Sequence, residues 1–384
     1  MAPSPAPVFL RSVGTAVPVT VLRQAAFRDV LAAQPGLSRL GARRLRMAFD
    51  ASGIDTRHTV LTELGDSPVS DVATPDDAAR SEPVHFDART ATVLSPSTGT
   101  RNAAYAREVP GLFLAAAKEA LSSSDLAPDD VTHVVTVSCT GFFAPGPDYL
   151  LVRQLGLRPT TQRFHLGFMG CYGAFPGLRL AHAVCRADPG AVVLVVCAEL
   201  CSLHLHLGDD LDTILSSSLF ADGAAAVVVS GRAPAAGEET VTLDALGTTL
   251  SDDGEADMAW TIGDLGFDMV LSRYVPRILG SSLPAALPSL LGLVDPKDID
   301  RWAVHPGGRS VLDQVQAVLG LGDEHLEPSR AVLRRYGNMS SPTVLFVLAE
   351  LLRAPATAPE QLAALAFGPG LTVESALLTR TPAA

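Results

Sequence analysis

Short β-branched runs alternate along this chain with longer stretches of helical spacing. Two such runs, residues 131–137 (VTHVVTV) and 192–197 (VVLVVC), flank the helical stretch 172–187. Strands that are apolar on both faces are buried on both sides, and their alternation with helices is typical of α/β proteins. The sequence therefore predicts an α/β fold with buried strands.

The alternation stops at a stretch rich in Pro, Gly and Glu (232–239) and then begins again. We therefore expect two similar halves, residues 1–235 and 236–384. Residues 63–101 lack periodicity and are expected to form a long surface loop. The second half is expected to contain a helix over 275–291, a strand over 302–304, a helix from 311, a long apolar helix after Asn338, and strands over 362–367 and 372–378.

Charge and cysteine content exclude several classes of protein. The formal net charge of -12 makes nucleic acid an unexpected partner, because the one basic cluster, residues 43–46, is too small to offset it. Five cysteines without Cys-x-x-Cys pairing favour free thiols in a reducing compartment and no structural zinc site. The start of the chain resembles no signal peptide, and the longest apolar run, 191–198, is too short to span a bilayer. We expect a cytoplasmic protein without membrane insertion.

Cys171 lies in the segment GFMGCYG (167–173), after an apolar run and before a helical pattern. A thiol at such a turn faces the positive end of a helix dipole, which favours the thiolate, and the glycines leave the backbone open to a substrate. These features indicate a nucleophile. The alternative is a small core residue, as predicted for Cys185 and Cys197.

His305 and Asn338 also lie at the mouths of predicted elements. His305 ends an apolar strand before Pro306 and two glycines, where it could pair with a thiolate or donate to a thioester oxygen. Asn338 precedes a long apolar helix, where the alternative role is an N-cap. Taken singly, each residue is as compatible with a structural role as with a catalytic one.

Six motifs in this order resemble the chalcone synthase family of type III polyketide synthases, and the resemblance runs from Phe9 to the end of the chain. The resemblance is closer to bacterial members, which also carry SCTG and ELCSL-type motifs. The motifs are SCTGFFAPGPDYLL (138–151), GFMGCYG (167–173), LFADGAAA (219–226), HPGG (305–308), YGNMSS (336–341) and GPGLTVE (368–374).

The resemblance implies a thiolase-like fold of five layers, α/β/α/β/α, duplicated in the two halves, with a catalytic triad of Cys171, His305 and Asn338. It further implies that Phe220 and Phe267 are gatekeepers between the coenzyme A tunnel and the reaction cavity. The implied reaction is decarboxylative condensation of malonyl-CoA units onto an acyl-CoA starter held on Cys171, followed by cyclisation to a pyrone or resorcinol.

Other substrate contacts follow from the same resemblance. Cys139 and His204 stand at cavity-wall positions that are usually threonine in plant members, and Gly308 and Gly370 lie in the HPGG and GPG loops. Arg43 and Arg46 match two of the family's basic positions for the coenzyme A phosphates, whereas the third falls at Asp50 or Ala51.

No metal, nicotinamide or flavin is expected, because the chain has no HExxH, no Walker loop and no GxGxxG after a strand. The expected partners are acyl-CoA, malonyl-CoA and a second copy of the chain, paired through Phe143-Ala144-Pro145. Delivery of the starter by an acyl carrier protein stays open. The alternatives are a β-ketoacyl-ACP synthase III, which performs one condensation, and a non-catalytic CoA-binding scaffold of the same fold.

Overall fold

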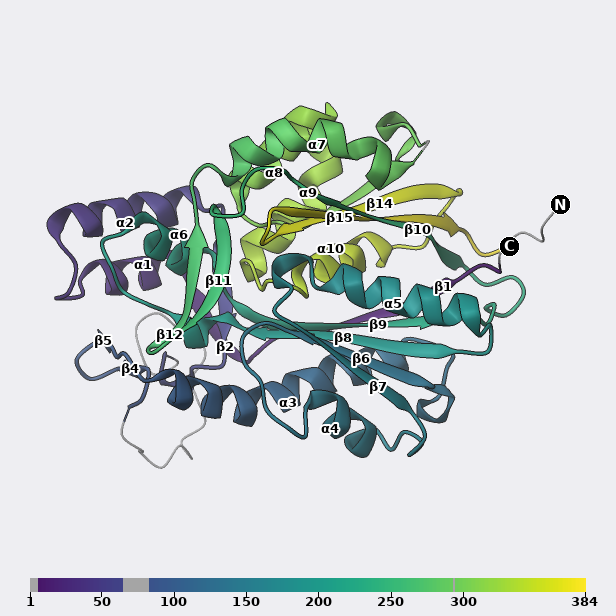
Figure 1. The fold of residues 1–384 in the computed structure, drawn as a ribbon, viewed down its shortest axis with the longest axis horizontal. Helices are drawn as coiled ribbons and strands as arrows, with labels where there is room; N and C mark the ends of the chain where they lie inside the picture. The colour runs from purple at the N-terminus through teal and green to yellow at the C-terminus, as the bar shows by residue number, and fades with distance from the viewer. Residues whose placement is uncertain (1–5, 65–82, 293) are drawn as a thin grey trace.

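The computed structural model describes residues 6–64, 83–292 and 294–384 (Figure 1). Within these residues, the main sheet has nine strands, and two groups of strands meet where β1 and β10 pair at Phe9 and Thr242. In order across the sheet, the strands are β13 (Arg301–Val304), β14 (Glu360–Gly368), β15 (Thr372–Thr381), β10 (Thr240–Leu250), β1 (Phe9–Ala16), β9 (Asp222–Ser230), β8 (Val192–Leu200), β6 (His133–Ser138) and β7 (Gln162–Gly167).

Helices complete five layers. Two central helices, α5 (Ala174–Ala187) and α10 (Thr343–Leu352), pack between the two groups of strands (Figure 1). The outer face of the first group is covered by α3 (Thr98–Ser122) and α4 (Pro147–Gln154), and that of the second by α7 (Val275–Leu291), α8 (Arg309–Leu319) and α9 (Asp323–Tyr336). Three buried apolar clusters fill the spaces between the layers. The predicted α/β fold of five layers is confirmed.

The two groups of strands repeat one chain order. The series β1, α3, β6, α5, β8, β9 is followed by the series β10, α7, β13, α10, β14, β15. In the first series β6 and β8 pair in parallel, and β9 pairs antiparallel with both β8 and β1. In the second series β13 and β14 pair in parallel, and β15 pairs antiparallel with both β14 and β10. Cys171 precedes the central helix of the first series and Asn338 precedes that of the second. The duplication thus brings the starts of α5 and α10 to equivalent places.

Smaller elements gather at one end of the layers (Figure 1). Ser38 caps α2 by accepting a hydrogen bond from the backbone N–H of Gly41, and Asp210 caps α6 in the same way. These elements are α1 (Gln24–Ala32), α2 (Arg39–Ala51), α6 (Leu211–Leu219), β2 (Thr20–Arg23), β3 (Thr56–Thr59), β4 (Phe86–Asp87), β5 (Thr92–Val93), β11 (Met258–Gly263) and β12 (Gly266–Leu271). Short 3-10 turns are η1 (Thr62–Leu64), η2 (Pro128–Asp130), η3 (Gly170–Tyr172), η4 (Cys201–His204) and η5 (Pro296–Asp298).

Most predicted element positions agree with the structure. The helix predicted over 275–291 is α7, and the strands predicted over 302–304, 362–367 and 372–378 are β13, β14 and β15. The loop predicted over 63–101 is wrong at its end, because Ser97 caps the start of α3 and β4 pairs with β5. Residues 65–82 of that loop lie outside the described residues.

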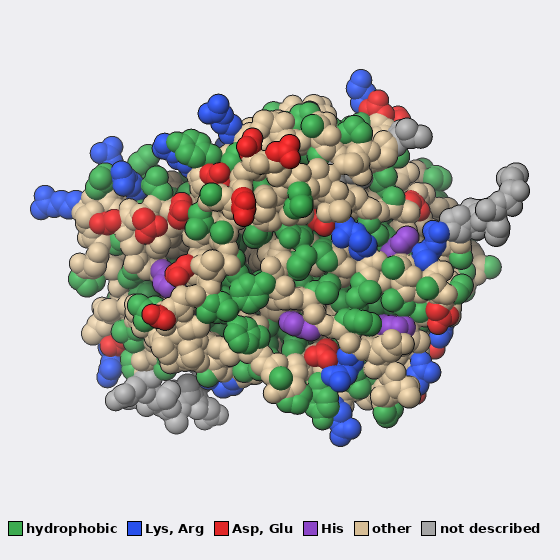
Figure 2. Space-filling model, viewed as in Figure 1, with side chains coloured by type: hydrophobic (Ala, Val, Ile, Leu, Met, Phe, Trp, Pro, Cys, Tyr) green, Lys and Arg blue, Asp and Glu red, His purple; other side chains and the backbone are tan. Residues whose placement is uncertain are grey.

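Strand β7 forms an outer edge of the main sheet and pairs, among the described strands, with β6 alone. Most of its residues are exposed, including Phe164, and Phe142 and Phe168 beside it are also exposed. Figure 2 shows hydrophobic side chains gathered across the middle of the face on which β7 lies, with charged side chains mainly around the rim. This edge is therefore unpaired among the described strands, and exposed phenylalanines lie on it and next to it.

Candidate active site

A cavity of about 290 Å³ lies between the two halves of the chain. Its lining joins Cys171 from the first half to His305 and Asn338 from the second. Most of the surface that lines the cavity is apolar, so the three polar groups face a largely apolar space. The structure thus brings the three predicted catalytic residues to one cavity.

Cys171 lies in η3, the turn that joins β7 to α5, and its side chain is 8% exposed. The preceding residue, Gly170, has a φ of 77°, and a Cβ at that position would lie 2.4 Å from Cδ of Pro369. The turn between β14 and β15 therefore closes against the nucleophile turn and leaves no room for a side chain at residue 170.

Burial raises the pKa of Cys171 to about 11, while hydrogen bonds from Ser340 and Asn338 act in the opposite direction. The resting side chain is therefore a thiol, in contrast to the thiolate expected from the helix N-terminus. The physical reason is that the cavity places no cation close enough to offset desolvation of the charged form.

His305 continues the pairing of β13 with β14, since its backbone N–H donates to the Leu365 carbonyl at 2.8 Å. The side chain is 1% exposed, and neither ring nitrogen has a hydrogen-bond partner among the described residues. Burial lowers the pKa of His305 to about 3, so the ring is neutral at pH 7. A neutral ring with both nitrogens unpartnered can accept one proton and donate another.

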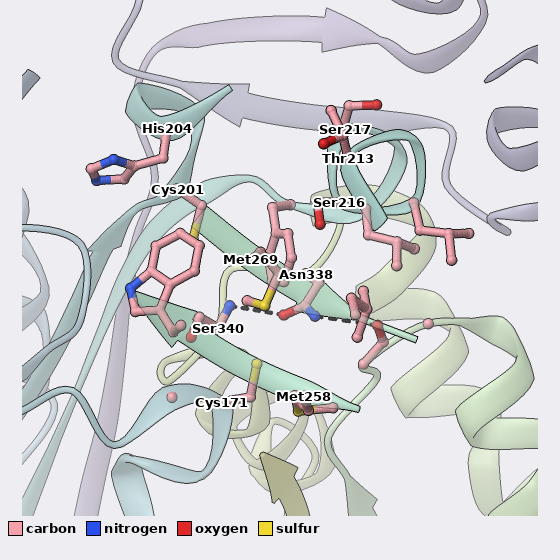
Figure 3. Close-up of a pocket in the computed structure, with 18 of the residues that line it drawn as sticks. Cys171, Cys201, His204, Thr213, Ser216, Ser217, Met258, Met269, Asn338 and Ser340 are labelled. Atoms are coloured by element: carbon pink, nitrogen blue, oxygen red, sulfur yellow. Dashed lines mark hydrogen bonds between the residues drawn. The ribbon is translucent and has the colours of Figure 1, made fainter. Parts of the chain in front are cut away.

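Asn338 is held by backbone bonds on both sides. Its N–H donates to the Leu219 carbonyl and its carbonyl accepts from Ala221, each at 2.9 Å. The side-chain Oδ1 accepts the Ser340 N–H at 2.8 Å and Nδ2 donates to the Gly307 carbonyl at 3.2 Å (Figure 3). The amide orientation is thus fixed, and its second N–H bonds to Cys171. The N-cap role is excluded because Pro342 caps α10.

The two predicted gatekeepers, Phe220 and Phe267, also line the cavity. Phe220 ends α6, and its carbonyl accepts a hydrogen bond from Nη1 of Arg57 at 2.8 Å. Phe267 lies in β12 and is 1% exposed. Sequence motifs did not indicate Arg57, whose guanidinium packs against the rings of Phe27 and Phe49.

Cys139, His204 and Gly308 line the cavity as predicted, whereas Arg43, Arg46 and Gly370 are not part of its lining. Both arginines are exposed on α2, and Gly370 lies in the turn between β14 and β15 with a φ of 114°. Figure 3 shows the thiols of Cys171 and Cys201 pointing into the same space. Lining residues that sequence reasoning missed are Arg57, Cys201, Trp260, Arg273 and Ser340.

Glu199, at the end of β8, supports the wall from behind. Its carboxylate accepts hydrogen bonds from the Cys139 N–H at 2.8 Å, the Thr140 hydroxyl at 2.9 Å and the Ser341 hydroxyl at 2.6 Å. Burial raises the pKa of Glu199 to about 7, against these bonds. A glutamate inside an otherwise apolar strand was the sequence signal for this position, and it was not used.

Neither a candidate metal cluster nor a helix able to cross a membrane lies in the part of the chain that the structure describes. There, no group of three or more His, Cys, Asp and Glu side chains could hold a metal ion. None of the helices within residues 6–64, 83–292 and 294–384 has the length and apolar character to cross a membrane.

Comparison with known proteins places this site in context. The family model described as chalcone and stilbene synthases, N-terminal domain, matches residues 3–234, and the one for the C-terminal domain matches residues 245–382. Bisdemethoxycurcumin synthase from rice (Oryza sativa subsp. japonica) is 36% identical over 301 residues, 75% of each chain.

Two solved structures share the whole fold. The C-terminal type III polyketide synthase domain of Steely1, a type I/III hybrid from Dictyostelium, is 27% identical with a TM-score of 0.82. The match covers 98% of this chain and 100% of that chain. PKS-I from the brown alga Ectocarpus siliculosus is 28% identical with a TM-score of 0.86. The match covers 98% of this chain and 99% of that chain.

A cysteine, a neutral histidine and a fixed asparagine amide at a buried cavity between duplicated α/β halves define an acyltransferase of the condensing type. The family matches cover nearly all of the chain. This chain belongs to the chalcone and stilbene synthase family, and it is a type III polyketide synthase, an enzyme class that uses acyl-CoA and malonyl-CoA. The relative from rice does not support the expected closeness to bacterial members.

Proposed function

We propose that this enzyme builds a short polyketide on Cys171 from an acyl-CoA starter and malonyl-CoA. The observation that carries the assignment of roles is His305, a buried neutral ring with two unpartnered nitrogens in the cavity of Cys171 and Asn338. Unpartnered polar atoms are rare in protein interiors. A ligand that hydrogen-bonds to them offsets the free energy lost by their burial.

In the loading step, His305 takes the proton of the Cys171 thiol as the sulfur attacks the thioester carbonyl. The new bond is sulfur to acyl carbon, and the bond that breaks joins this carbon to the coenzyme A sulfur. Coenzyme A leaves as its thiol after the proton returns from the imidazolium. The resting thiol, with its raised pKa, makes this base necessary.

In the extension step, malonyl-CoA loses carbon dioxide and becomes the enolate of acetyl-CoA. The N–H groups of His305 and Asn338 donate to the thioester oxygen as it gains negative charge. The enolate carbon then attacks the acyl group on Cys171, which releases the cysteine sulfur and leaves a β-ketoacyl-CoA. Transfer of that product back to Cys171 allows another round.

Substrate recognition is distributed over the cavity and its entrance. We assign Phe220 and Phe267 as gatekeepers, Cys139 and His204 as cavity wall, and Gly308 and Gly370 to the loops around the thioester. Arg43 and Arg46 are exposed cations on an acidic chain and suit the phosphates of coenzyme A. The substrates themselves supply the reacting groups, so no cofactor or metal enters the proposal.

The product assigned to this chain is a tri- or tetraketide pyrone or resorcinol from an aliphatic starter. The mainly apolar surface of the cavity supports an apolar starter. The SCTG and ELCSL motifs support a bacterial type of enzyme. The boundary near residue 235, between the residue ranges that the two family models match, supports halves 1–235 and 236–384. A cytoplasmic location suits free thiols and soluble coenzyme A thioesters.

We also propose a homodimer that pairs along β7 and the adjacent Phe143-Ala144-Pro145 segment. An exposed, unpaired edge strand is a template for a second strand, and the neighbouring apolar side chains would be buried by pairing.

The test is incubation of the purified enzyme with malonyl-CoA and acyl-CoAs of short, aromatic and long-chain type, followed by mass analysis of the products. We expect carbon dioxide release and extended products. Cys171→Ala should form none, and His305→Ala and Asn338→Ala should each lose about 10²–10³-fold in kcat, the usual cost of one missing oxyanion donor.

Two outcomes would overturn the proposal. One is extension by Cys171→Ala at the wild-type rate, because the acyl group would then not be held on that sulfur. The other is use of a malonyl-carrier protein while malonyl-CoA is ignored, which is the behaviour of the synthase III alternative. Leu250→Ser is the control variant, because Leu250 is 70% exposed and does not line the cavity.

A further inference from the structure

The hairpin of β11 and β12 forms one wall of the cavity. It is a separate two-stranded sheet that pairs, among the described strands, with none of the main sheet (Figure 1). Met258, Trp260, Phe267 and Met269 from this hairpin all line the cavity. The position of the hairpin therefore sets how much space lies beside Cys171.

His204 bonds this hairpin to the opposite wall. Its Nδ1 accepts the backbone N–H of Phe267 at 3.0 Å, and its Nε2 lies 2.7 Å from the carbonyl oxygen of Thr140. An amide N–H can only donate and a carbonyl can only accept, so the ring carries its single proton on Nε2. One neutral histidine thus joins the backbones of two walls.

Aromatic contacts reinforce the same joint. The rings of His204 and Phe267 stack with centroids 4.1 Å apart and an interplanar angle of 15°. Trp260 meets both rings edge-on, and its indole N–H donates to the Cys139 carbonyl at 2.7 Å. The hairpin is therefore tied at two points to one short loop, residues 139–140. The backbone bond fixes β12 at Phe267, and the stacking contact holds its ring against His204.

The groups around His204 favour its neutral form. Burial lowers the pKa of His204 to about 3, and nearby Arg101, His206 and His85 lower it further, while the bond to Thr140 acts in the opposite direction. Glu199, at the end of β8, bonds to the Cys139 N–H and not to the imidazole. The joint is therefore complete throughout the neutral pH range.

We propose that His204 is a positioning residue that determines product length, because it latches the β11–β12 hairpin to the loop at Thr140 and so fixes the gatekeeper Phe267. This inference rests on the proposed polyketide synthesis. His204 acts through its hydrogen bond to the backbone of the hairpin and not through the bulk of its own side chain. Release of the latch lets the wall recede and the chain grow by further malonyl-derived units.

Three substitutions separate a latch from simple bulk. His204→Gln keeps an N–H donor but loses the acceptor beside Phe267, and His204→Asn keeps an acceptor but is too short to reach Thr140. His204→Ala loses both. A latch requires both ends, so all three variants should raise the ratio of longer to shorter products by about five-fold, the factor given by one lost hydrogen bond of ordinary strength. Bulk alone would leave His204→Gln close to wild type.

The matched control is His325→Gln on α9, a histidine that does not line the cavity. Trp260→Phe is a second route to the same test, because it keeps a large ring and removes only the bond to Cys139. We expect it to shift product length in the same direction as His204→Gln. A wild-type product ratio in both His204→Gln and Trp260→Phe would overturn the latch.

A measurement without turnover separates this inference from the proposed function. Amide hydrogen exchange over residues 258–271, followed by mass spectrometry, should be about five-fold faster in His204→Gln than in wild type or His325→Gln. The factor again corresponds to the loss of one hydrogen bond of ordinary strength. Unchanged exchange would overturn the latch even in an active enzyme. Faster exchange in an enzyme that ignores malonyl-CoA would retain the latch and overturn polyketide synthesis and its control of product length.

Discussion

At the scale of single residues, burial decides the charge of both groups that exchange a proton in the proposed reaction. Burial raises the pKa of Cys171 to about 11 and lowers the pKa of His305 to about 3. Thiol and imidazole are therefore both neutral before substrate binds. Proton transfer belongs to the chemical step, because an ion pair formed earlier would lie in an apolar cavity without further charge compensation.

The buried histidine should cost stability in acid. The unfolded pKa of histidine is about 6.5 and the folded pKa is about 3, so the unfolded state binds the proton first and stability falls with pH through this window. His305→Gln removes that linkage. Relative to wild type, the variant should gain roughly 2 kcal/mol between pH 6.5 and pH 5, at about 1.4 kcal/mol per pH unit.

Denaturant unfolding of wild type and His305→Gln at pH 7 and pH 5 measures this difference. The comparison between variants is needed because Glu199, with a pKa raised to about 7, acts in the opposite sense in both proteins. A constant difference in unfolding free energy at the two pH values would contradict a neutral, buried His305.

At the scale of elements, one carboxylate joins three segments that shape the site. Glu199 on β8 binds the loop after β6 through Cys139 and Thr140, and the turn before α10 through Ser341. These segments come from both halves of the chain, so Glu199 fixes the cavity wall relative to the turn that carries Asn338. Its role is mechanical support for the site.

Removal of this support should be expensive. Glu199→Ala leaves the buried N–H of Cys139 and three hydroxyls without an acceptor, for an expected loss of about 3 kcal/mol. Chemical denaturation against Glu108→Ala gives the comparison, because the carboxylate of Glu108 forms an exposed pair with the adjacent Arg107. A loss no larger than that of the control would show that water or relaxation replaces these bonds.

Local sequence patterns predicted elements whose own residues carry the signal. α7 was predicted over its full range, because its apolar residues recur at helical spacing. β11 and β12 were not predicted, because a separate two-stranded hairpin is stabilised by contacts with α6 and η4 and not by its own pattern. α9 was also missed, since its polar composition and internal Pro328 conceal a helix that packs on β13.

The same distinction applies to the candidate site. Cys171, His305 and Asn338 were predicted because each lies in a short motif, and the structure places all three at the cavity. The bond between His204 and the Phe267 backbone could not be predicted. It joins residues 63 positions apart and depends on how the hairpin folds back over η4.

At the scale of the whole molecule, the two halves contribute one central helix each, and the cavity lies where both begin. α5 and α10 both pack between the two groups of strands, so neither half could bury its central helix without the other. We therefore expect the chain to unfold as one cooperative unit, although its two halves repeat one order of strands and helices.

Dimer formation should depend on the exposed edge at β7. Phe164 is 38% exposed on this strand and stacks on His133, so Phe164→Glu would place a charge in the proposed interface. Sedimentation velocity at micromolar concentration should show a dimer for wild type and a monomer for Phe164→Glu. Val19→Glu, at a position 73% exposed and outside the main sheet that ends in β7, should remain a dimer. A wild-type monomer would exclude the interface.

The separateness of the β11–β12 hairpin bears on how such an enzyme can diversify. The residues proposed for bond formation stand at the starts of the two central helices and at the end of β13, whereas part of the cavity wall stands on a hairpin that shares no described strand with the main sheet. Substitutions in the hairpin can therefore accumulate without breaking the hydrogen bonds of the main sheet. The condensation chemistry and the shape of the product cavity then depend on different parts of the chain. A change of product therefore requires few mutations.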